Sequence, residues 1–120
     1  MELLQLIEKR TSIRKYQDKP IEQEKMVKIL EAMRRAPSAV NRQAWLFYVI
    51  TSPEMKARMA EVTQLKWVES AGAIIAVCGT DCGVMSNGHR SDTVDLSIAM
   101  SFAMLEAEDL GLGSLLDRPL

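Results

Sequence analysis

Apolar and polar residues follow two periods along this chain, one typical of helices and one typical of strands. Apolar residues three or four positions apart predict amphipathic helices, whereas short apolar runs bounded by polar or turn-forming residues predict strands. The expected helices span residues 2–10, 22–35, 53–67 and 91–110, and the expected strands span residues 46–51 and 73–78. The order is therefore helix, helix, strand, helix, strand, helix.

The same periods predict which side chains face inward. The expected inward residues are Leu3, Leu4 and Ile7 in the first helix, Met26, Ile29, Leu30 and Met33 in the second, and Met55, Met59 and Val62 in the third. The strand at residues 73–78 is apolar throughout, so burial on both faces is expected. The last helix is apolar on nearly every side, which is typical of a helix at the centre of a core or a dimer.

Local signals set the ends of these helices. Pro37 ends the second helix because the residue before a proline avoids the helical region. Ser52 is the expected N-cap of the third helix, with Pro53 at its first position. Ser91 or Asp92 is expected to cap the last helix, and Gly111 is expected to terminate it.

Helices and strands in this order predict one domain over residues 1–120 of the α+β or α/β class. Two strands alone make a marginal sheet. Further strands are therefore expected from a longer native chain or from a partner subunit.

The overall charge narrows the function classes. The sequence has 15 basic and 16 acidic residues, a net charge of −1, so we expect no nucleic-acid partner. The longest apolar stretch, residues 96–105, is about half the length needed to cross a bilayer, and we expect no membrane partner. The start shows no signal peptide, so two reduced cysteines in the cytoplasm are expected.

The first candidate site is residues 10–14, where Arg10 and Arg14 flank Thr11 and Ser12. Guanidinium groups match phosphate in a bidentate geometry, and hydroxyls add hydrogen bonds. In an extended segment, Arg10, Ser12 and Arg14 share a face and could converge on one phosphate. The alternative is a solvated basic turn.

The second candidate site is the polar loop at residues 38–44, before the first strand. Its Ser, Asn and Gln side chains could direct donors and acceptors at a planar heterocycle. The alternative is a structural loop with a turn at Asn41 and Trp45 in the core.

The third candidate is Gly111, Gly113 and Ser114, after the last helix, where glycines allow close approach to a flat ligand. The alternative is a helix C-cap and a turn. A dinucleotide-binding fingerprint is excluded, because the glycines follow a helix rather than a strand and Leu116 stands where a third glycine is required.

Metal binding and nucleophilic catalysis are not expected. Cys78, Cys82 and His89 are the soft ligands available, and no second pair completes a tetrahedron. His89 is the only histidine, and no Gly-x-Ser-x-Gly turn accompanies it. We therefore assign no metal ligand and no catalytic residue.

Taken together, several segments resemble the nitroreductase family of flavoproteins. The resemblance rests on residues 10–16 (RTSIRKY), 18–21 (DKPI), 29–32 (ILEA), 36–38 (APS), 41–45 (NRQAW), 47–50 (FYVI) and 110–114 (LGLGS). It implies an α+β sandwich, with a central sheet flanked by helices, in an interlocked homodimer that binds FMN. Two departures are Ala44, where the family usually has proline, and the end of the chain at Leu120, before the family's further strands.

The resemblance also implies roles for particular residues. Arg10, Ser12 and Arg14 would hold the FMN phosphate and ribityl chain, with Thr11 less certain because the family often has Arg or His there. Pro37, Ser38, Ala39 and Asn41 would approach the flavin from the other subunit. Gln64 or Thr63 would place a polar group near the flavin, and Gly111, Gly113 and Ser114 would lie against the isoalloxazine.

The implied function is an oxidoreductase that passes hydride from NAD(P)H through FMN to a nitroaromatic, a quinone or a similar small acceptor. Two alternatives remain open. One is a related flavin chemistry, such as dehalogenation or flavin fragmentation. The other is a flavin-binding or structural dimerisation protein without turnover.

Overall fold

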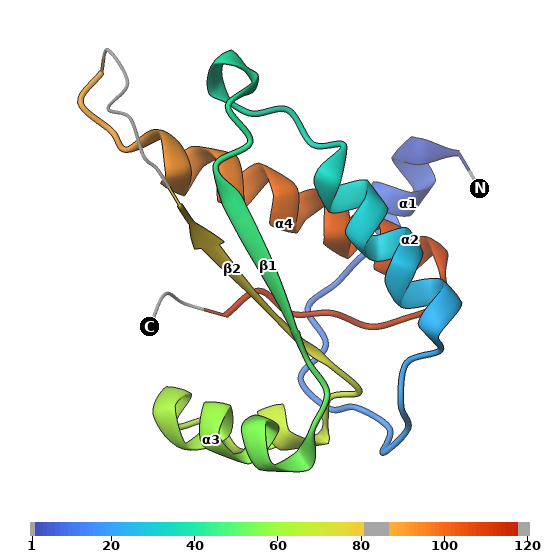
Figure 1. Ribbon diagram of the computed structural model, residues 1–120. Helices are drawn as coiled ribbons and strands as arrows, with labels where there is room; N and C mark the ends of the chain where they lie inside the picture. The colour runs from blue at the N-terminus through green and yellow to red at the C-terminus, as the bar shows by residue number, and fades with distance from the viewer. Residues whose placement is uncertain (1, 81–86, 118–120) are drawn as a thin grey trace.

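The computed structural model describes residues 2–80 and 87–117 of the 120-residue chain. Its elements are α1 (Leu3–Lys9), α2 (Gln23–Arg34), the short 3-10 helix η1 (Ala39–Asn41), β1 (Trp45–Ile50), α3 (Pro53–Thr63), the 3-10 helix η2 (Lys66–Ser70), β2 (Ile74–Gly79) and α4 (Ser91–Asp109). Figure 1 shows them in one α+β unit. The four helices and two strands that the sequence predicts are all present, and most of their ends agree within two residues.

The two strands form a small antiparallel sheet in which Trp45 pairs with Gly79 and Ile50 with Ile74. Both strands lie one residue away from their predicted bounds. Residues of β1 alternate between the core and solvent, because Leu46 and Tyr48 are exposed whereas Trp45 and Phe47 pack against the core. α3 and η2 connect the strands and lie at the lower end of the sheet in Figure 1.

The core lies where α2 and α4 pack against each other and against one face of the sheet (Figure 1). Met33, which is 1% exposed, is its largest fully buried side chain. The facing residues of α4 are small, so the two helices can approach closely. The buried core residues are Ile29, Met33, Ala36, Ala99, Ala103 and Ala107.

The structure shows which face of α4 is buried in the core. Its buried residues are Ser91, Asp95, Ala99, Ala103 and Ala107, which recur every fourth position. Larger apolar side chains such as Phe102 point outward and are partly exposed. Small residues occupy the packed face because the neighbouring helix leaves little room there.

Burial in α1 and α3 also differs from the prediction. In α1, Leu6 is buried and Leu3, Leu4 and Ile7 are exposed. In α3, Ala60 and Thr63 are buried, whereas Met55 and Val62 are exposed. Both helices lie at the margin of the described structure, so little protein covers their larger apolar side chains.

Three predicted boundaries or burials are wrong. α3 ends at Thr63 instead of continuing through Trp67, because Gln64 adopts a left-handed conformation with φ 61°. The N-cap position of α4 is occupied by Arg90 rather than by Ser91 or Asp92. β2 is half-buried over most of its length, and Cys78 is exposed.

Candidate functional site

The segments at residues 10–14 and 111–114 come from opposite ends of the sequence and lie side by side in the structure. Ser12 and Ser114 form a parallel β-bridge, and the Ile13 N–H donates to the Ser114 carbonyl oxygen at 3.0 Å. The first and third candidate sites therefore form one region, which we call the bridge region (residues 10–14 and 111–114).

Side chains alternate along the first strand of the bridge region. Ile13 is half-buried and packs against Gly113, where an added Cβ would lie 2.9 Å from Ile13 Cγ1. Ser12 and Arg14 are exposed. Because neighbouring side chains of an extended strand point to opposite sides, Ser12 and Arg14 share the face away from Ile13.

Donors on that face remain available for a ligand. Within residues 2–80 and 87–117, neither Arg10 nor Arg14 forms an ion pair, and the Ser12 hydroxyl makes no hydrogen bond. Burial raises the pKa of the Tyr16 hydroxyl above its ordinary value, and the positive charge of the nearby Arg14 only partly offsets this rise. Two guanidiniums and a hydroxyl without protein partners suit an anion such as a phosphate.

The second candidate site, the loop at residues 38–44, is held in an unusual conformation. Val40, Asn41 and Gln43 have φ values of 47°, 54° and 54°. Positive φ is uncommon for residues other than glycine, and such strained residues cluster at ligand sites. Two local hydrogen bonds hold Gln43: its N–H donates to Ser38 Oγ at 3.0 Å, and its Nε2 donates to Asn41 Oδ1 at 2.8 Å.

A residue that sequence reasoning missed also holds this loop. Asp95 of α4 is 5% exposed, and its Oδ1 accepts a hydrogen bond from the Ala39 N–H at 3.0 Å. The sequence did contain a signal, because Asp95 is a lone carboxylate among apolar neighbours, and acidic residues are rarely buried without a partner. Its partner is 56 positions away in the sequence, so the pattern alone could not identify it.

Gln64 lies at the C-cap of α3 and is exposed, while the neighbouring Thr63 is buried with its hydroxyl donating to the Met59 carbonyl oxygen at 2.8 Å. Of the two polar groups considered there, only Gln64 is therefore oriented toward solvent. Pro37 is exposed at the start of the loop, directly after the buried Ala36.

One chain does not bring all these residues together. Figure 1 shows the loop at the top of the view, the bridge region below α4, and Gln64 at the end of α3 at the bottom. Within one chain, the loop therefore lies apart from the bridge region (Figure 1). The expected approach of Pro37, Ser38, Ala39 and Asn41 to a flavin of the other subunit stays a prediction.

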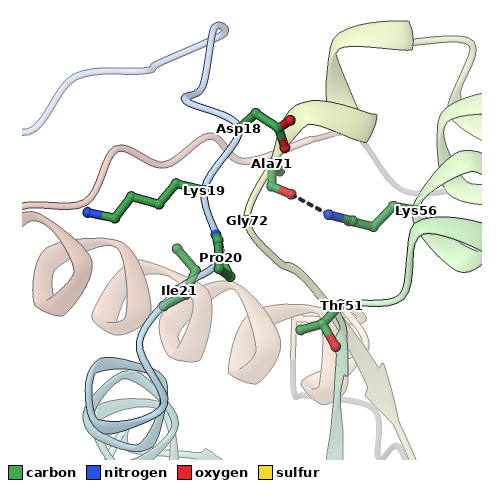
Figure 2. A pocket seen from close by; sticks show the side chains of 8 residues that line it. All are labelled: Asp18, Lys19, Pro20, Ile21, Thr51, Lys56, Ala71 and Gly72. Carbon is green, nitrogen blue, oxygen red and sulfur yellow. Dashed lines mark hydrogen bonds between the residues drawn. The ribbon is translucent and has the colours of Figure 1, made fainter.

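A recess of about 360 Å³ lies elsewhere, where residues 18–21 cross the start of β2 (Figure 2). Lys56 Nζ donates to the Ala71 carbonyl oxygen at 3.0 Å along one side of it. A Cβ at Gly72 would lie 2.7 Å from the Lys19 carbonyl oxygen, so the crossing requires glycine. None of the predicted site residues lines this recess; its lining residues are Asp18, Lys19, Pro20, Ile21, Thr51, Lys56, Ala71 and Gly72.

Among the described residues, no three His, Cys, Asp or Glu side chains form a group that could hold a metal ion. Cys82, considered above as a ligand, lies outside the described residues. No helix in the described ranges has the length and apolar character required to cross a membrane.

Comparisons with known proteins agree with this fold. The model of the nitroreductase family matches residues 7–74. A protein of Archaeoglobus fulgidus, whose name provisionally assigns it as an NADH dehydrogenase/NAD(P)H nitroreductase, is 39% identical over 94% of this chain and 65% of its own length. A nitroreductase family protein from Clostridium novyi NT has a TM-score of 0.86 at 30% identity, over 94% of this chain and 67% of its own.

A third comparison concerns the cofactor. A solved structure described as an FMN-dependent nitroreductase from Clostridium difficile R20291 has a TM-score of 0.76 at 31% identity, over 92% of this chain and 62% of its own.

A pair of helices packs over a small sheet, with polar clusters around it. This fold is that of a nitroreductase-like α+β protein. The chain belongs to the nitroreductase family. It spans 59% and 65% of the lengths of two curated relatives.

Proposed function

We propose that this chain binds FMN and works as a nitroreductase-like oxidoreductase, using NAD(P)H and a small acceptor such as a nitroaromatic or a quinone. The proposal rests on the bridge region, where the donors of Arg10, Ser12 and Arg14 have no partner within residues 2–80 and 87–117. The family assignment supports the same chemistry, because a similar solved protein is described as FMN-dependent.

The residues present suit FMN. Two guanidiniums and a hydroxyl match a terminal phosphate dianion. Gly113 has no side chain, so its backbone can lie close to Ile13 and the two segments of the bridge region can pair. Arg10, Ser12 and Arg14 would hold the phosphate and ribityl chain, with a further contact from Thr11. Gly111 and Ser114 would lie beside the ring system.

When bound, FMN would supply the redox chemistry, accepting two electrons from NAD(P)H and passing them to the acceptor. The chain would contribute anchoring and oriented donors. Donors from the loop at residues 38–44 and from Gln64 would lie where negative charge develops on the ring. No side-chain nucleophile is required, which agrees with the assignment of no catalytic residue.

A homodimer is part of this proposal. Pro37, Ser38, Ala39 and Asn41 lie apart from the bridge region in one chain, so two copies would complete each site. The apolar side chains exposed on α1 and α4 are suited to an interface. Cytoplasmic location also remains a proposal.

The deciding experiment is an absorbance spectrum of the purified protein before and after anaerobic NADH or NADPH. We expect a yellow protein whose flavin band is bleached by reductant. A colourless protein that binds no added FMN would rule out the proposal.

A second candidate is a flavin-binding dimer without turnover. A yellow protein that neither NADH nor NADPH bleaches would identify this candidate. Related flavin chemistries, such as dehalogenation, would instead show bleaching and a different choice of acceptor.

Replacing both Arg10 and Arg14 with alanine tests the anchoring residues. We expect FMN binding to weaken by at least a hundredfold, because each hydrogen bond to a charged group contributes about 1.5–3 kcal/mol. Fluorescence titration of the apo-protein measures this. The double variant Lys9→Ala/Lys15→Ala removes the same charge from neighbouring positions and should bind FMN nearly as the wild type does. Equal losses in both variants would show that only overall charge matters.

A further inference from the structure

Asp95 is a carboxylate buried inside α4, and its environment is unusual for a charged group. The side chain is 5% exposed, and the only hydrogen bond recorded for it comes from the Ala39 N–H. Within the described residues it has no cationic partner. Burying a carboxylate against one neutral donor is costly. Its presence on a buried face whose other members are Ser91, Ala99, Ala103 and Ala107 therefore calls for a role beyond packing.

Its partner, Ala39, belongs to the loop at residues 38–44, where three of the four described non-glycine residues with positive φ lie. Three residues of the loop at 38–43 have positive φ, and they follow Ala39 directly or within four positions. A loop in this conformation persists only when its surroundings hold it. The bond from Ala39 to Asp95 is the one hydrogen bond in the described structure that ties this loop to α4.

The hydrogen bonds within the loop determine which donors it can offer. The N–H groups of Asn41 and Arg42 donate to Ser38 and Ala39 carbonyl oxygens. Gln43 uses both its N–H and its Nε2 within the loop. Among the described contacts, the donors of this loop that have no partner include the Ser38 hydroxyl, the Val40 N–H and the Asn41 side-chain amide N–H groups.

We propose that Asp95 is a positioning residue for flavin binding: it holds Ala39 so that the loop presents the Ser38, Val40 and Asn41 donors to the acceptor atoms of the flavin ring. This inference rests on the proposed function. Asp95 itself contacts no flavin in this proposal, because its carboxylate is already bound to Ala39 inside the protein.

The test compares FMN affinity in the full-length protein for Asp95→Ala, Asp95→Asn and wild type. Asp95→Ala should weaken FMN binding by about tenfold or more, the order expected for loss of one charge-assisted hydrogen bond. In the apo-protein it should also speed hydrogen exchange at the Ala39 amide. Asp95→Asn keeps an acceptor oxygen and should recover most of the affinity.

Two controls separate positioning from general destabilisation. Ala103→Gly weakens the same buried face of α4 without touching the loop, so it should lower the Tm and leave FMN affinity unchanged. Ala39→Pro removes the donor from the other side of the bond. Proline is tolerated at the first position of a helical turn, and Ser38 before it is extended, with φ −137° and ψ 156°. Ala39→Pro should therefore weaken FMN binding as Asp95→Ala does, and it provides the test if Asp95→Ala does not fold.

The outcomes distinguish the two proposals. A wild-type protein that binds no FMN overturns the proposed function, and this inference with it. A wild type that binds FMN, with Asp95→Ala or Ala39→Pro binding equally well, overturns this inference alone. An affinity loss in Ala103→Gly as large as that in Asp95→Ala also overturns it, because stability would then explain both.

Discussion

Gly113 shows how a single residue can determine whether two distant segments meet. A methyl group at this position would lie 2.9–3.1 Å from three side-chain atoms of Ile13, closer than ordinary van der Waals contact. The same strand pairing joins Ser12 to Ser114. Glycine is therefore required at position 113 because the two segments of the bridge region approach each other closely there. Gly111 has a different role, since its φ of 79° suits a helix terminus.

Replacing Gly113 with alanine should push the two strands of the bridge region apart. Overpacking of this kind costs about 1–3 kcal/mol, which urea denaturation would measure, and FMN affinity should fall with it. The double variant Gly113→Ala/Ile13→Ala removes the close contacts with the Ile13 Cγ1 and Cγ2 atoms. It should therefore lose less stability than the two single variants together. Simple additivity of the single effects would contradict the assigned contact.

Among the elements, α2 has the clearest electrostatic feature, at its C-terminal end. Glu31 accepts hydrogen bonds from Arg34 and Arg35 at 2.8–2.9 Å. These bonds lower the pKa of the Glu31 carboxyl from 4.5 to about 2. The Glu31 side chain is 45% exposed, so solvent screening limits what the ion pairs contribute to stability.

The pH dependence of stability tests this cluster. A carboxyl whose pKa is lower in the folded state stabilises the protein above its unfolded-state pKa, and the contribution is lost as the pH falls toward 2. We therefore expect Glu31→Gln to lower the Tm slightly at pH 7, with the difference from wild type vanishing near pH 2. Glu61→Gln on α3, which has no ion pair among the described residues, is the matched control. If the difference in Tm between Glu31→Gln and the wild type stays constant from pH 7 to pH 2, the ion pairs of Glu31 are not its cause.

In the whole molecule, apolar side chains remain exposed on neighbouring helices. α1 packs against α4, and the exposed fractions of Leu3, Leu4 and Phe102 are 65%, 64% and 38%. A small domain cannot bury all its apolar surface alone. This surface supports the proposed homodimer, and the separation of the bridge region from the loop at 38–44 supports it independently.

Phe102→Glu should convert the proposed dimer to monomers, because a charge would be placed in an apolar interface. Sedimentation velocity measures the change, and FMN affinity should fall together with dimerisation if each site needs both chains. Val62→Glu alters an apolar residue on α3 that is 63% exposed, and it should leave the dimer intact. A wild-type protein that sediments as a monomer would refute the prediction.

The sequence by itself determined the order and type of the elements. Helical and strand periods arise from local backbone geometry, so α2, β1, β2 and α4 could be placed to within about two residues. The Arg10–Arg14 cluster and the glycines after α4 could also be singled out, because their chemistry and conformational freedom belong to the residues themselves.

Only the tertiary structure decided which faces are buried and which segments meet. Periodicity identifies apolar side chains but not the neighbour that covers them, so Leu3, Leu4, Met55 and Val62 were wrongly assigned inward. The pairing of Ser12 with Ser114 and the bond from Ala39 to Asp95 join residues far apart in the sequence. Contacts of this kind depend on how the elements pack in three dimensions, and no local pattern encodes them.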